Sequence, residues 1–180
     1  MKKIASIVIF VLVVIAGYVA AGPFLTAYSI RTALVDQNSQ KLSENIDFPA
    51  LRQNVKDQLR AIMMEKASAE LKDNPFAAVA TGFAAKMADG VVDAVVTPGG
   101  LANLMEKKKK SKSNDESKET SDSPSKKENL LENARYSYDS LSKFSVWVPN
   151  DKGEELRFVL KREGLSWKLV NVVIPVDKKS

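Results

Sequence analysis

An uncharged run near the start of the chain constrains its fold more than any other feature. No charged residue occurs at positions 4–22, and Lys2 and Lys3 precede this run. At about 1.5 Å per residue, a helix of this length can cross the hydrocarbon core of a bilayer. Its Ile and Val residues lie on all sides of the helix, which disfavours a buried helix of a soluble protein. The sequence therefore predicts a membrane-directed segment at residues 1–23.

Two interpretations of this segment stay open. The basic start, apolar middle and small residues at 20–22 fit a cleaved signal peptide, with a possible cut after Ala21. An uncleaved anchor is favoured because the apolar run is long, because Pro23 follows Gly22 directly, and because PFLTAYSIRTAL continues a helical pattern. Both interpretations keep the two lysines in the cytoplasm and export the rest of the chain. We expect a single-pass anchor or, after cleavage, a soluble exported domain.

Residues 24–105 carry helical patterns. Asp47 can cap a helix start, and Pro49 suits the first turn because its missing N–H has no partner there in any case. The apolar residues that follow recur at helical spacing and predict one stripe: Leu51, Val55, Leu59, Ile62 and Met63. We therefore expect the stretch DFP to begin a helix.

A second helix is predicted to begin in the same way, at Asn74 and Pro75. Lys86, Asp89 and Asp93 lie within it and make a second membrane span improbable. Its large apolar residues form one row: Phe76, Val79, Phe83, Met87, Val91 and Val95. The stretch TPGG then predicts a stop.

Residues 106–128 have a different composition. The stretch EKKKKSKSNDESKETSDSPSKKE contains no apolar residue and both signs of charge. Such a segment cannot offset its ordering entropy by burial, so we predict a disordered insert. The four lysines at 107–110 could touch acidic lipids or nucleic acid, but a solvated charge run is favoured because acidic residues follow closely.

Residues 129–180 change from helical spacing to alternation. KFSVWV, ELRFVLKR and LSWKLVNVVIP each place alternate apolar residues on one face, and short turns separate them. Strands of this kind form an antiparallel meander with one apolar face that the earlier helices must cover. The predicted fold is α+β: a membrane-spanning helix, a helical first half at 24–105 and a three- or four-stranded antiparallel sheet.

The composition excludes several kinds of chemistry. The chain has no Cys and no His, which removes thiol nucleophiles, disulfides and the commonest general base and metal ligand. Asp89, Asp93 and Tyr136 are conceivable catalytic groups, but no spacing links them, and a solvated carboxylate pair near Lys86 is the favoured interpretation. We predict no enzyme, no cofactor and no metal site. Nucleic-acid binding is not expected either, because the domain is exported.

The remaining hypotheses concern binding and assembly. A concavity between helices and sheet could bind a lipid, an apolar small molecule or a peptide, and its candidate lining residues are Trp147, Trp167, Phe158 and Phe83. For the two tryptophans, a place in the core is the simpler interpretation. The alternative is a structural or assembly factor that docks another envelope protein.

Three stretches carry a resemblance: IDFPALRQNVKDQL, VDAVVTPGGLANLM and LSWKLVNVVIP. There the chain resembles an uncharacterised bacterial family of small single-span envelope proteins, a domain of unknown function. The resemblance covers nearly everything except the insert and implies no activity. It implies the bacterial inner membrane, with the C-terminal domain outside the cytoplasm, or the periplasm after cleavage. Helices followed by a curved sheet also look like the cone-shaped nuclear-transport-factor and cystatin-like folds, which host both enzymes and binders.

Overall fold

The computed structural model describes residues 2–70, 76–115, 133–150 and 153–175. Within them the elements follow in this order: α1 (Lys2–Val35), α2 (Ser39–Asn45), α3 (Phe48–Glu70), α4 (Ala77–Val95), α5 (Pro98–Asp115), β1 (Arg135–Ser140), β2 (Lys143–Pro149), β3 (Glu155–Glu163) and β4 (Ser166–Val173). The helical half followed by a four-stranded antiparallel sheet confirms the predicted α+β class.

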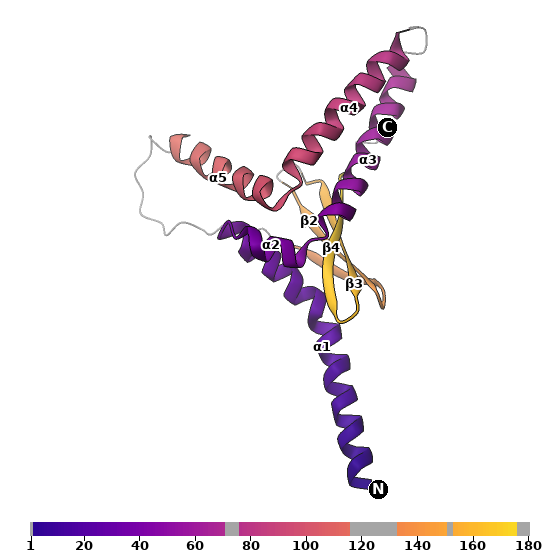
Figure 1. Cartoon of the computed structure of the whole chain (residues 1–180), viewed down its shortest axis with the longest axis vertical. Coiled ribbons are helices and arrows are strands. Elements are labelled where there is room, and N and C mark those ends of the chain that lie inside the picture. The colour runs from indigo at the N-terminus through magenta and orange to yellow at the C-terminus, as the bar shows by residue number, and fades with distance from the viewer. Residues whose placement is uncertain (1, 71–75, 116–132, 151–152, 176–180) are drawn as a thin grey trace.

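The helices radiate from the sheet (Figure 1). The N-terminal half of α1 extends beyond the sheet in one direction, and α3 and α4 form a hairpin that projects in the other. Every described residue at positions 3–18 is exposed, and burial of α1 begins at Val19. The α1 helix therefore has a bare half and a half packed on the domain.

The sheet is a meander in the order β1-β2-β3-β4, and each neighbouring pair is antiparallel. Cross-strand pairs such as Phe144 with Leu160 and Val146 with Phe158 put the predicted apolar residues on one face. We call this the core face. It also carries Tyr136 and Tyr138 from β1, the strand that precedes the three quoted stretches.

The core lies between this face and the helices α1, α2 and α3. Leu42 of α2 and Phe144 of β2 are fully buried, and Ile46 forms a parallel bridge to Leu169 of β4. The predicted helix start is confirmed, because Asp47 Oδ1 accepts a hydrogen bond from the Ala50 N–H at 3.0 Å. The stretch DFP thus joins the first turn of α3 to the sheet.

Helix α3 also covers an edge of the sheet. The Asn54 side chain donates to the Val170 carbonyl at 2.9 Å, and Gln58 donates to the Val172 carbonyl at 3.0 Å. The Ile174 N–H donates to Gln58 Oε1 at 3.2 Å. Val170 lies where the β3–β4 register shifts, so these amides bind backbone groups that the ladder leaves without partners.

Helix α5 differs from the expected boundary at residue 105. Thr97 Oγ1 accepts from the Gly100 N–H at 3.0 Å, Pro98 opens the helix, and the helix continues to Asp115. Lysine is a good helix former, and no Pro or Gly occurs in 101–115, so the charged run prolongs the helix. The remainder of the predicted insert, 116–128, and the predicted cap at Asn74 and Pro75 lie outside the described residues.

Candidate functional site

Five aromatic side chains gather where α1 meets the sheet. Phe24 of α1 contacts Phe144 with ring centroids 4.8 Å apart, and it also contacts Tyr136 at 5.5 Å. Tyr138 lies 4.8 Å from Phe144 and 6.0 Å from Trp167, measured between the same points. We call this group the aromatic collar: Phe24, Tyr136, Tyr138, Phe144 and Trp167.

The collar binds backbone carbonyl groups of α1. Pro23 lies inside this helix and has no N–H, so the carbonyl of Val19 has no helical donor. The indole Nε1–H of Trp167 donates to that carbonyl at 3.1 Å, and the Tyr138 hydroxyl donates to the next one, that of Ala20. The sheet therefore supplies the hydrogen bond that proline removes from the helix.

A glycine lets the two parts approach closely. A Cβ atom placed on Gly22 would lie 2.6 Å from Cδ1 of Trp167, well inside contact distance. On the other side of Trp167, its carbonyl accepts from Thr26 Oγ1 at 3.3 Å. Gly22 thus leaves room for the indole ring of Trp167, and Thr26 binds the backbone of the same residue.

Partial burial of Tyr138 affects its protonation. It raises the pKa of the Tyr138 phenol above its ordinary value, because the charged phenolate is less well solvated there, although the residue remains 44% exposed. The neutral phenol is also the form that donates to Ala20.

The apolar row of α4 points away from the domain. Its large members Phe76, Val79, Phe83, Met87 and Val91 are 60–73% exposed. Small residues between them are exposed too, and no charged residue interrupts the surface. We call this surface the α4 face: Phe76, Val79, Ala80, Phe83, Ala84, Met87, Gly90, Val91 and Ala94.

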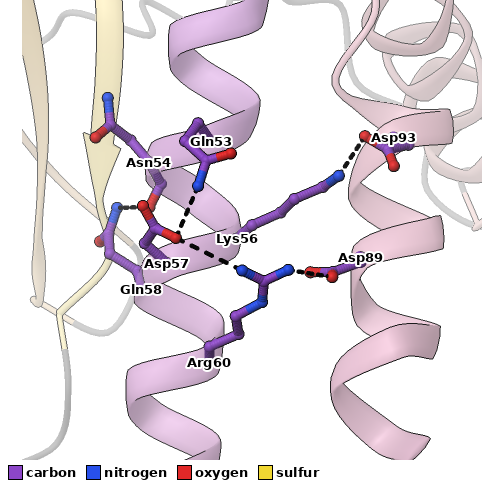
Figure 2. A network of polar contacts seen from close by, with 8 residues as sticks. All are labelled: Gln53, Asn54, Lys56, Asp57, Gln58, Arg60, Asp89 and Asp93. Atoms are coloured by element: carbon purple, nitrogen blue, oxygen red, sulfur yellow. Dashed lines mark hydrogen bonds and ion pairs between the residues drawn. The ribbon is translucent and has the colours of Figure 1, made fainter. Parts of the chain in front are cut away.

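The opposite side of α4 packs on α3 through its smaller side chains. Ala85 and Ala88 are half-buried and Val92 is buried, so small residues face the neighbouring helix. Two ion pairs fasten the same hairpin (Figure 2): Lys56 Nζ lies 2.6 Å from Asp93 Oδ1, and Arg60 binds Asp89. The large apolar side chains are therefore left on the outside.

Those two ion pairs also occupy the carboxylates of Asp89 and Asp93. Each carboxylate has its own cation from α3, and Arg60 further approaches Asp57 at 3.8 Å. The hydrogen bond that Arg60 donates to the Asp89 carboxylate raises the pKa of Arg60 above its ordinary value. Tyr136 lies in the aromatic collar and not beside them. The three conceivable catalytic groups thus occupy two separate places.

The four candidate ligand-binding residues are not gathered either. Trp167 is buried in the collar, and Phe158 is half-buried on the core face. Trp147 lies on the other face of the sheet, where Arg135 stacks on its ring at 5.5 Å and binds Glu155 at 2.6 Å. Phe83 belongs to the α4 face.

Sequence reasoning missed Gly22 and Pro23 as binding residues, and also Asn54 and Gln58. A proline inside a helical pattern was the available signal, since it implies an unpaired carbonyl four residues earlier. Among the described residues, no cluster of three or more acidic side chains could hold a metal ion. In the same residues, one helix, Lys3–Val35, is long and apolar enough to cross a membrane.

Comparisons with known proteins identify a family for this chain. No curated protein and no solved structure matches the chain. A family model described as "Protein of unknown function (DUF2939)" matches residues 12–104, slightly more than half of the chain. This region begins within the bare half of α1, includes all of α3 and α4, and ends in α5. The expectation of an uncharacterised family is confirmed, and the chain belongs to the family Protein of unknown function (DUF2939).

Proposed function

We propose that this protein is a non-catalytic, single-span membrane protein that associates with a second copy of itself through the α4 face. The observation that carries the proposal is the row of exposed, uncharged side chains on α4. Soluble monomers rarely expose a continuous apolar patch of this kind, and such patches mark interaction sites. Exposed Phe76, Phe83 and Met87 would gain most from being covered.

A second copy is the occupant that best fits the chemistry. A face without charge requires a partner face without charge, and the chain itself supplies one. The row from Phe76 to Val91 is about 22 Å long at the helical rise, and a single helix is about 10 Å across. The area of this row is therefore smaller than the roughly 800 Å² per partner of a standard interface. We therefore expect weak association in solution and stronger association between tethered copies, because tethering raises the effective concentration.

The anchor is part of the same proposal. With α1 in the bacterial inner membrane and the domain outside the cytoplasm, the α3–α4 hairpin would project away from the bilayer, since it points opposite to the bare half of α1 (Figure 1). The face would then be open to other membrane-held proteins. Such a role needs no catalytic group, in keeping with the paired state of Asp89 and Asp93.

Crosslinking in membranes tests this proposal directly. The chain has no cysteine, so Ala80→Cys gives a single thiol on the α4 face while Phe83 is retained. We expect oxidation to yield a disulfide-linked dimer of full-length Ala80→Cys in membranes. Adding Phe83→Ser should lower the yield about tenfold, because a large apolar contact is lost.

Ser68→Cys, on an exposed position of α3, is the matched control for random collisions. Equal yields from Ala80→Cys and Ser68→Cys would contradict the proposal. So would a yield from Ala80→Cys that Phe83→Ser leaves unchanged.

Binding of a lipid or an apolar small molecule or peptide is the second candidate. One observation favours it: Val148, Leu156, Phe158 and Val172, at the end of the core face away from the collar, are only half-buried. Native mass spectrometry of the full chain checks this function. A reproducible additional mass that Phe158→Ser abolishes would support it, and a clean protein mass would weigh against it.

A further inference from the structure

We propose that one end of the sheet sits in the headgroup layer of the bilayer that α1 crosses, with Leu141 and Leu165 inserted among the lipids. We call this end the turn end and define it as residues 139–143 and 161–168. The inference rests on the proposed membrane anchor. It adds a second contact between the protein and the bilayer, made by the domain itself.

The two turns point in the same direction. In the meander, the β1–β2 turn and the β3–β4 turn lie at one end of the sheet, and the β2–β3 connection lies at the other. Along β1, Tyr136 contacts Phe24, whereas Tyr138 reaches Ala20, nearer the N-terminus of α1. Continuing past Tyr138, the chain reaches the turn at Leu141 farther toward the bare half of α1.

Strand β4 gives the same direction independently. Trp167 binds the Val19 carbonyl, whereas Leu169 bridges Ile46. From Trp167 to Leu169, β4 therefore runs away from the bare half of α1. Leu165 precedes Trp167 by two residues, or about 7 Å of extended chain. Both turns therefore lie at the end of the sheet from which the N-terminal half of α1 extends (Figure 1).

The length of bare helix is too short for a bilayer. The uncharged part of α1 in which every residue is exposed covers residues 4–18, about 22 Å at the helical rise. A typical hydrocarbon core is about 30 Å thick. Of the next residues, Val19 and Ala20 already bind Trp167 and Tyr138 of the aromatic collar, so a full-thickness core brings the collar and both turns into the bilayer boundary. Trp and Tyr side chains are favoured at this depth.

The turn end has the side chains that this position requires. Leu141 is 86% exposed and Leu165 is 62% exposed. Both leucines lie at the tips of tight turns, away from the core. Four cations accompany two acids: Lys143, Lys161, Arg162 and Lys168 against Asp139 and Glu163. Two apolar tips within a net positive rim match acidic headgroups above hydrocarbon.

Depth measurement with spin labels tests the inference. Single-cysteine variants Leu141→Cys and Leu165→Cys of the full chain are labelled with a nitroxide and reconstituted in phosphatidylcholine vesicles containing phosphatidylglycerol. Pro149→Cys, exposed at the opposite end of the sheet, is the matched control. We expect labels at 141 and 165 to be about tenfold less accessible to a water-soluble nickel chelate than the label at 149.

Two outcomes would overturn the inference, and each differs from a failure of the anchor. If the protein floats with the vesicles but all three labels are equally accessible to the chelate, the membrane anchor is supported and the insertion of the turn end is contradicted. If the protein does not float, the anchor itself has failed. Dimerisation through α4 is measured separately, by the crosslinking of Ala80→Cys.

A charge variant separates lipid headgroups from a protein partner. Lys161→Glu with Arg162→Glu should raise chelate accessibility at position 165 in vesicles with phosphatidylglycerol, because the rim becomes negative. Equal chelate accessibility of position 165 in the charge variant and in the unchanged protein would mean that acidic lipid does not cover the turn end, and would contradict the inference.

Discussion

At the scale of single residues, the junction between α1 and the sheet depends on an exchange of hydrogen bonds. Pro23 takes one donor out of the helix, and Trp167, 148 residues beyond Val19 in the chain, supplies another to the Val19 carbonyl. A proline inside a helix is ordinarily costly, because the carbonyl four residues earlier loses its partner. Here that carbonyl is instead the point at which the sheet is fixed to the helix.

Gly22→Ala should destabilise this junction. The added Cβ would lie 2.6 Å from Cδ1 of Trp167, so the ring must move, at a cost of about 1–3 kcal/mol. Thermal unfolding of the full chain in detergent, followed by tryptophan fluorescence, measures the loss. Gly17→Ala is the matched control, since nothing lies within 4 Å of its added Cβ. Equal effects of the two variants would refute the close packing.

A double-mutant cycle tests the exchange itself. Trp167→Phe removes the indole donor and should cost about 1 kcal/mol through the bond to Val19, in addition to any loss of packing. Pro23→Ala restores a backbone N–H that can bond to the same carbonyl. In the Pro23→Ala background we therefore expect Trp167→Phe to cost less. Strictly additive free energies of unfolding would show that the two residues are not coupled through Val19.

Tyr138 makes the junction sensitive to high pH. Burial raises its pKa, so the neutral phenol is favoured in the folded state more than in the unfolded chain. Its contribution to stability is full below pH about 10, the ordinary tyrosine pKa, and is lost as pH rises through the raised pKa. We expect Tyr138→Phe to show a smaller loss of stability above that pH than the wild type. Identical alkaline profiles would contradict this assignment.

At the scale of elements, α3 connects helix α4 to the sheet through two polar sides. One side places Lys56 and Arg60 against α4, and the other places Asn54 and Gln58 against β4. Each ion pair has one partner that is about half exposed, Asp93 or Arg60, so solvent screens the pair and its contribution to stability is small. The amides, in contrast, satisfy backbone groups of a sheet edge. The side of α3 that carries Asn54 and Gln58 is therefore the more important one for holding the helices on the sheet.

Gln58→Ala should accordingly cost about 1–3 kcal/mol, because the Val172 carbonyl and the Ile174 N–H both lose a partner. Amide hydrogen exchange should accelerate along β4 as its cover loosens. Gln53→Ala is the control on the same helix, since Gln53 bonds only with Asp57 among the described interactions. That variant should stay within about 0.5 kcal/mol of the wild type. Comparable losses from both variants would argue against a role for Gln58 at the edge.

The elements also show what sequence reasoning can reach. The helix start at Asp47 and the antiparallel meander were predictable, because capping and strand alternation are local signals. The direction of the α4 face was not, because periodicity reveals that a row exists but not which side a neighbour will cover. The bond from Trp167 to Val19 was likewise out of reach, since it joins the two ends of the chain.

At the scale of the whole molecule, the first helix is part of the fold. A cut after Ala21 would remove the Val19 and Ala20 carbonyls, which are the acceptors for Trp167 and Tyr138. We therefore expect the protein to keep its first residues in the membrane. Intact-mass measurement of the protein from its own cells checks this, and a mature chain beginning at Gly22 would contradict it.

The continuity of α1 has a consequence for symmetry. If α1 spans a bilayer as we propose, copies in one bilayer all enter it in the same direction, because this helix runs without a break from its bare half into the domain. Two copies that share the same face are then related by a two-fold axis along the membrane normal. Phe83, midway along the row, would meet its own counterpart near that axis. Such a contact closes on itself and leaves no face for a third copy, so assembly through α4 would stop at two.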